Sequence, residues 1–147
     1  MAIRFSFQSG NLDPFDAAKL SQWITTVVNA RNFQVGNVSY LFCDDEYLLD
    51  VNQRYLAHDT YTDIITFDYV AGNLVSGDIL ISTERVKENA QQYSTSFHRE
   101  LLRVIIHGIL HLLGQGDKSE KDAAEMRRQE EASLTLWNDM FHEEQVA

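Results

Sequence analysis

The chain has 147 residues, 44% of them hydrophobic, so it can form one substantial core, and we expect a single domain over residues 1–147. Its net charge of −10 argues against a broad nucleic-acid-binding surface, because nonspecific affinity for phosphates comes mainly from lysine and arginine. The apolar runs are too short or interrupted for a membrane span or a signal peptide, and a single cysteine excludes an internal disulfide, so we expect a cytoplasmic protein with no membrane partner.

The first half of the chain predicts two strands and two helices. Alternating apolar and polar residues predict a strand over residues 3–7. Asp13 is typical of a helix cap, and the apolar stripe after it predicts a helix over residues 14–32. A second strand over residues 38–43 is followed by two aspartates that favour a short capped helix over about residues 45–55.

The second half predicts a strand pair followed by three helices. The strands cover residues 64–69 and 78–82, and a helix over residues 83–93 follows them. A break rich in serine and threonine precedes a long helix that is apolar around nearly its whole circumference, and Ser119 with Asp122 resembles a capping box for the last helix. These elements predict an α+β fold in which a small mixed sheet of about four strands packs against a central helix.

The central helix carries the clearest chemical pattern in the chain. His107 and His111 are four residues apart, so they leave the same face of a helix at a spacing that suits one metal ion. Gly114 can end the helix in a left-handed turn, and Asp117 can then return as a third ligand. Three ligands with a position open for water are typical of catalytic zinc, so we expect one zinc per chain. Asp78 begins a predicted strand, where a turn or backbone-bonding role is favoured over metal ligation.

Two other interpretations of the histidine pair are open. Both histidines could be hydrogen-bonded core residues, although such a pair needs neither a helix-ending glycine nor a carboxylate aimed back at it. The pattern His-x-x-x-His-x-x-Gly-x-x-Asp also resembles the zinc motif of metzincin peptidases, which carry a glutamate general base directly after the first histidine. That position is Gly108 here, so a peptidase would need a base from elsewhere, such as Asp63.

The segment from His107 to Gly114 resembles, residue for residue, the His-Gly-x-Leu-His-Leu-x-Gly motif of the YbeY family of bacterial metal-dependent endoribonucleases. Asp117 stands where that family has its third histidine. The last helix is similar to the family's final helix in its methionine and glutamate, Met126 and Glu130. An earlier segment is similar to the same family at Asn52, Tyr55, Thr62, Asp63 and Phe67.

Leu56 is a second departure from the family pattern, because the family commonly carries arginine at this position and arginine is a natural partner for a phosphodiester. Arg54, His58 or Arg103 could take its place. Arg103 lies one helical turn before the first histidine of the motif, although an ion pair with Glu100 is its alternative role. In so acidic a chain, the field inside a cleft would be set by the metal and a few basic groups.

The resemblance implies an endoribonuclease of ribosomal RNA processing and maturation, with RNA rather than DNA as its substrate and ribosomal or assembly proteins as further partners. Zinc on the three ligands would lower the pKa of its bound water and polarise a phosphoryl oxygen, and that water or the ribose 2′-hydroxyl would attack. The catalytic side chains are left open among Arg103, Arg54 and Asp63. A metzincin-type zinc peptidase and a nonenzymatic ribosome assembly factor with structural zinc are the alternatives.

Overall fold

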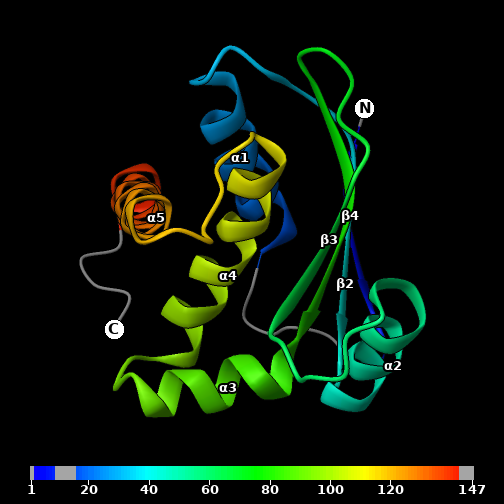
Figure 1. Ribbon diagram of the computed structural model, residues 1–147. Coiled ribbons are helices and arrows are strands. Elements are labelled where there is room, and N and C mark those ends of the chain that lie inside the picture. The colour runs from blue at the N-terminus through cyan, green and yellow to red at the C-terminus, as the bar shows by residue number, and fades with distance from the viewer. Residues whose placement is uncertain (1, 9–15, 143–147) are drawn as a thin grey trace.

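A mixed four-stranded sheet is the frame of the protein, whose computed structural model describes residues 2–8 and 16–142 (Figure 1). The strands run in the order β1-β2-β4-β3, with the first three parallel and the edge strand β3 antiparallel to β4. Their bounds are β1 (Ala2–Phe7), β2 (Gln34–Cys43), β3 (Ile64–Asp68) and β4 (Leu74–Ser82). The predicted small mixed sheet is confirmed.

Within the described residues, five helices surround this sheet. They are α1 (Ala17–Asn29), α2 (Asp45–Leu56), α3 (Thr83–Gln92), α4 (Phe97–Leu112) and α5 (Glu120–Phe141). Helices α1 and α4 cover one face of the sheet, α5 packs outside them, and α2 lies against the opposite face (Figure 1). None of the described helices is both long enough and apolar enough to cross a membrane. The predicted α+β fold around a central helix is confirmed, and that helix is α4.

Three helices begin at the capping residues that their sequences indicate. At each start, a side-chain oxygen accepts a hydrogen bond from a backbone amide of the first turn, which pairs a donor that the helix leaves free. The capping residues are Asp44 for α2, Ser96 for α4 and Ser119 for α5. Local side-chain chemistry therefore fixes where these three helices start.

The limits of the first helix differ from those predicted. Asp13 and the proline after it lie outside the described residues, and the observed cap of α1 is Asp16, whose carboxylate accepts hydrogen bonds from two amides of the first turn. The helix also ends at Asn29, three residues earlier than expected. Trp23 then ties α1 to α5, because its indole nitrogen donates a 2.8 Å hydrogen bond to the backbone oxygen of Ser133.

Two strands begin four residues earlier than predicted. The extra residues at the start of β2 pair with those at the start of β4, beginning with Gln34 and Leu74. A register shift then separates this short ladder from the rest of the pairing between the two strands. The alternation of the sequence missed these extensions because both contain glycine, which is depleted in strands. Asp78 therefore lies in the middle of β4 and not at a strand start, paired in register with Ser39 and Phe67.

Helix α4 is buried on most of its circumference and lies directly on the sheet. A Cβ atom built on Gly108 would be 3.0 Å from Cγ2 of Ile79 and 3.1 Å from Cδ1 of Ile64, so the two layers approach as closely as a glycine permits. On the same face, the Tyr40 hydroxyl donates a 2.8 Å hydrogen bond to the backbone oxygen of Ile105. Burial raises the pKa of Tyr40 well above its ordinary value, so the hydroxyl keeps its proton.

We expect Gly108→Ala to lower the free energy of unfolding by about 1 kcal/mol. Overpacking a core costs roughly 1–3 kcal/mol, and the better helix propensity of alanine returns about 1 kcal/mol. Urea unfolding of the parent, Gly108→Ala, Ile79→Ala and the double variant measures this. Ile79 supplies two of the three close contacts, so Gly108→Ala should cost less in the Ile79→Ala background. An equal cost in both backgrounds would show that contact with Ile79 does not limit the size of the side chain at residue 108.

Candidate metal centre

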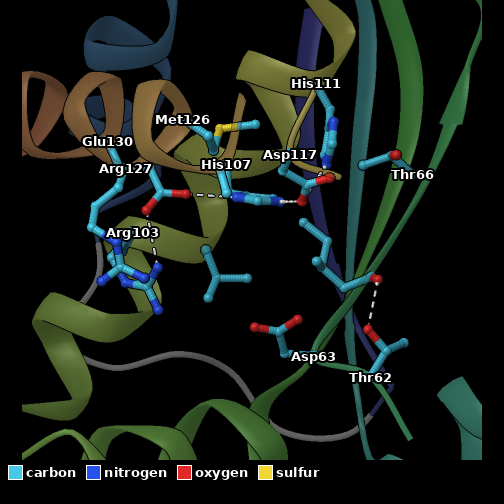
Figure 2. Close-up of a pocket in the computed structure, with 13 residues that line it drawn as sticks. Thr62, Asp63, Thr66, Arg103, His107, His111, Asp117, Met126, Arg127 and Glu130 are labelled. Carbon is cyan, nitrogen blue, oxygen red and sulfur yellow. Dashed lines mark hydrogen bonds and ion pairs between the residues drawn. The ribbon is translucent and has the colours of Figure 1, made fainter. Parts of the chain in front are cut away.

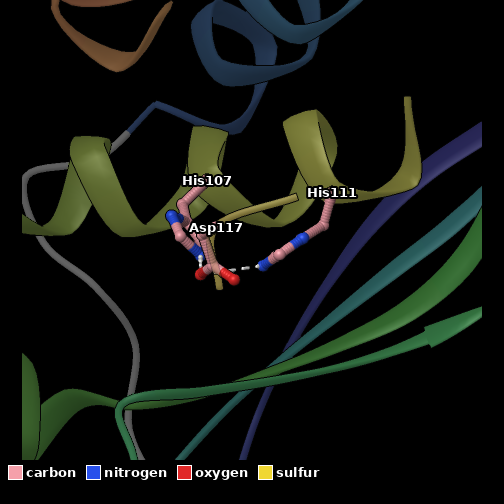
Figure 3. Close-up of side chains that lie close together, drawn as sticks. All are labelled: His107, His111 and Asp117. Carbon is pink, nitrogen blue, oxygen red and sulfur yellow. Dashed lines mark ion pairs between the residues drawn. The ribbon is translucent and has the colours of Figure 1, made fainter. Parts of the chain in front are cut away.

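His107 and His111 project from the same side of α4, with the carboxylate of Asp117 between them (Figure 3). Their ring centroids are 4.6 Å apart and the rings are nearly perpendicular. Oδ2 of Asp117 lies 3.4 Å from Nε2 of His107 and 3.3 Å from Nε2 of His111. One possible ligand atom from each residue lies within 4.8 Å of the others. The structure therefore brings together the three residues that the sequence nominated.

A glycine turn at the end of α4 brings Asp117 back to the histidines. Gly114 has a φ of +99°, which residues with a Cβ rarely adopt. Its amide donates to the backbone oxygen of His111 at 2.9 Å, and the amide of Gln115 donates to the backbone oxygen of Leu110 at 3.0 Å. These two bonds form a Schellman motif, which pairs the last carbonyls of the helix and reverses the chain.

The Gln115 side chain holds this returning loop against α5. Its amide nitrogen donates to the backbone oxygens of Gly116, at 2.9 Å, and Asp122, at 3.3 Å. Its amide oxygen accepts a 3.0 Å hydrogen bond from the side chain of Gln129. The position of Asp117 is thus set by the end of α4 on one side and by α5 on the other.

A buried carboxylate on α5 supports His107 from behind. Glu130 is 2% exposed, and its Oε2 lies 2.6 Å from Nδ1 of His107 (Figure 2). A carboxylate accepts hydrogen bonds, so Nδ1 carries the proton and Nε2 is free to face Asp117. Arg103 donates to the other oxygen of Glu130 at 2.9 Å and to both oxygens of Glu100, which is also 2% exposed.

The charges in this network stabilise one another. Burial raises the pKa of Glu130, but hydrogen bonds and charges from His107 and Arg103 outweigh burial and leave that pKa below its ordinary value. Burial likewise opposes the charge of Arg103, yet Glu100 and Glu130 raise the pKa of the guanidinium. Arg103 therefore bridges two buried carboxylates, one of which supports His107.

The cluster opens into a pocket of about 380 Å³ between α4, α5 and the segment that leads into β3. Thr62, Asp63 and Thr66 line the wall on the β3 side (Figure 2). Arg103 and Arg127 line the wall formed by the helices. The pocket is open to solvent, so a substrate can reach the cluster.

Comparison with known proteins identifies the family. The family model described as endoribonuclease YbeY matches residues 5–138. This chain belongs to the YbeY family. It is 49% identical over 144 residues to a Flavobacterium johnsoniae protein named Endoribonuclease YbeY, covering 97% of this chain and 99% of that protein. A Christiangramia forsetii protein of the same name is 54% identical over 123 residues, 84% of this chain and 83% of that protein.

A solved structure agrees with the family assignment. The fold is similar to the solution structure of TM1509 from Thermotoga maritima, with a TM-score of 0.66 and 25% sequence identity. The match covers 96% of this chain and 92% of that protein. The resemblance drawn from the histidine motif is confirmed for the family and for the fold.

The candidate catalytic residues of this chain differ in where they lie. Asp63 and Arg103 line the pocket, and Arg103 is held by two buried carboxylates. Arg54 does not line it and instead forms a 3.2 Å ion pair with Asp50 on the exposed surface of α2. Leu56 at the end of α2 lies outside the pocket lining as well. The geometry leaves Asp63 as the candidate carboxylate on the wall opposite the helices.

Gly108 faces the sheet and not the pocket. A side chain there would meet Ile79 and Ile64, so a glutamate at the metzincin base position would run into β4 and β3. The metzincin base therefore has no place in this fold. A peptidase mechanism would depend on Asp63.

Sequence reasoning missed the supporting role of Glu130. A signal was present, because Glu130 lies four residues after Met126 and four before Leu134, and both are apolar residues of the buried stripe of α5. A carboxylate on such a stripe needs a buried partner. Arg127 gave no comparable signal, because an arginine on the exposed face of a helix is common.

The donor set fits zinc, because imidazole nitrogen and carboxylate oxygen are both common zinc ligands. We expect about one zinc per chain, with binding abolished in His107→Ala and His111→Ala. Asp117→Ala should weaken it by more than about tenfold, since even outer-shell partners contribute 10–100-fold. Competition with a chelator measures the affinity, and Asp63→Asn is the matched control from the same pocket. Unchanged affinity in Asp117→Ala would place the third ligand elsewhere.

In the metal-free protein, we expect Glu130→Gln to lower the free energy of unfolding by about 2 kcal/mol at pH 7, because it removes one charge from a buried hydrogen-bonded network. The pKa of Glu130 is lowered in the folded state, so its contribution is present above the unfolded value of about 4.5 and is lost as the pH falls through the folded value. Urea unfolding at a series of pH values from 7 into acid measures this. The difference in free energy of unfolding between the parent and Glu130→Gln should become smaller as the pH falls.

Asp50→Asn is the control for this prediction. Asp50 pairs with Arg54 on α2, and both side chains are more than half exposed, so its removal should change stability little. Glu130→Gln should also weaken zinc binding by about 10–100-fold, the usual effect of losing the partner of a ligating histidine. Equal effects of the two substitutions would contradict the role given to Glu130.

Proposed function

We propose that this chain is a zinc-dependent endoribonuclease that acts in ribosomal RNA processing and maturation, in the cytoplasm, as one domain over residues 1–147. The observation that carries the proposal is the cluster of His107, His111 and Asp117 at an open pocket. Support comes from the family, whose members in Flavobacterium johnsoniae and Christiangramia forsetii are named endoribonucleases. Ribosomal or assembly proteins are the further partners that we propose.

His107, His111 and Asp117 would hold the zinc. When bound, zinc would act as a Lewis acid toward a phosphoryl oxygen and lower the pKa of water. Glu130 orients His107 through Nδ1, and the loop of Gln115 orients Asp117, so the ligands are preorganised. With a carboxylate in place of a third imidazole, the centre carries one positive charge less than a three-histidine site and attracts phosphate less strongly.

Asp63 is the residue that we propose for proton transfer. Its carboxylate lines the pocket from the side opposite the helices, where it can accept a proton from the attacking hydroxyl (Figure 2). Arg103 is less suited to contact phosphate, because Glu100 and Glu130 already balance its charge and occupy its donors. We therefore assign Arg103 a supporting role and Asp63 the catalytic one.

Two alternatives are less well supported. A metzincin-type peptidase lacks its usual base, since the Gly108 position faces the sheet. A nonenzymatic assembly factor would need the zinc only as a structural element, yet structural zinc sites usually have four protein ligands. The described residues bring three candidate ligands together here, beside an open pocket.

Cleavage assays separate the three functions. We expect the zinc-loaded protein to cleave single-stranded segments of ribosomal RNA, to lose this activity with chelator and to spare unfolded casein. Asp63→Asn should reduce RNA cleavage by about 100-fold or more while keeping its zinc, as expected for loss of general acid–base catalysis. Casein cleavage would favour the peptidase, and intact RNA with fully loaded zinc would favour the assembly factor.

A further inference from the structure

A second cavity adjoins the pocket into which His107, His111 and Asp117 open. It has a volume of about 300 Å³, and Arg103 and Arg127 line both cavities. Its other lining residues include Tyr93, Thr95 and Arg99, from the end of α3 and the start of α4. Three of the 12 lysines and arginines in this acidic chain thus line two cavities that share part of their walls, and Glu100 and Glu131, the partners of Arg103 and Arg99, also line the second one.

The three arginines differ in whether their charge is already balanced. Arg99 forms a 2.6 Å ion pair with Glu131, and Arg103 is bound by two buried carboxylates. Arg127 is exposed, and within residues 2–8 and 16–142 its guanidinium makes neither an ion pair nor a hydrogen bond. Arg127 is therefore the arginine at these cavities whose donors are available to a ligand.

The residue next to Arg127 shows that this difference is local. Arg128 lies on the same helix, but it pairs with Glu125 and lines neither cavity. Figure 2 shows Arg127 running down from α5 along the same wall of the metal pocket as Arg103. Two adjacent arginines of equal charge are thus placed in different surroundings.

We propose that Arg127 binds a backbone phosphate of single-stranded RNA beside the metal centre, and that the adjoining cavity receives the neighbouring nucleotide. The proposal rests on the proposed function and deepens it. A guanidinium can donate two parallel hydrogen bonds to one phosphate, and the donors of Arg127 face the pocket with no other partner among the described residues. The net charge of −10 repels RNA from most of the surface, which confines binding to this path.

Tyr93 supplies a surface for the base of that nucleotide. It is 58% exposed, caps the C-terminal end of α3 and lines the second cavity. Bases of single strands commonly stack on such exposed aromatic rings. Arg127 and Tyr93 therefore offer one contact to the phosphate and one to the base.

Salt-dependent RNA binding tests the proposal. The zinc-loaded parent, Arg127→Gln and Arg128→Gln are titrated against a fluorescent 2′-O-methyl oligonucleotide, with a gel to confirm that it stays intact. We expect Arg127→Gln to weaken binding about tenfold and to reduce the slope of log Kd against log salt by about 0.7, the value for one phosphate contact on a single strand. Arg128→Gln, with the same change of charge, should stay near the parent.

Tyr93→Ala should weaken binding roughly fivefold or more, as for loss of one stacked base. Tyr69→Ala is its control, since Tyr69 is 60% exposed but lines neither cavity. Unchanged melting temperature and zinc content show that each variant is folded. If the parent binds and cleaves RNA but Arg127→Gln behaves like Arg128→Gln, this inference fails and the proposed function stands. If the parent neither binds nor cleaves RNA, both fail.

Discussion

At Gly108 the backbone of α4 lies so close to Ile79 and Ile64 that even a methyl group would be crowded. This approach fixes the rotation of the helix about its axis as well as its distance from the sheet. Neighbouring residues of a helix are turned by about 100°, so with Gly108 against the sheet His107 points away from the core toward α5 and the loop. The packing of the core thus decides which way His107 and His111 face.

Mutual pairing explains why charged side chains of α4 and α5 can be buried beside the cluster. Glu100 and Glu130 would each be costly to bury alone, but they share Arg103, and Glu130 also meets His107. Each group keeps a partner, so the network is satisfied and the ring of His107 has one favoured orientation.

Local spacing predicted that the three candidate ligands come together, because His107, Gly114 and Asp117 fall within eleven residues and their geometry follows from one helix and one turn. The sheet was also predicted, although the pairing of Gln34 with Leu74 had no local signal and depends on tertiary contact. The support of His107 by Glu130 was missed because it joins α4 to α5, and sequence periodicity does not say which helix faces lie against each other.

The centre draws its parts from two helices and the loop between them, and this has a consequence for synthesis. A chain made from its N-terminus completes the sheet and α4 before α5 exists. Until then the Nδ1 of His107 lacks Glu130, and the loop of Asp117 lacks its attachment to Gln129. A nascent chain therefore holds His107, His111 and Asp117 without these supporting contacts while the earlier elements emerge, so the centre takes its final form only when the last helix docks.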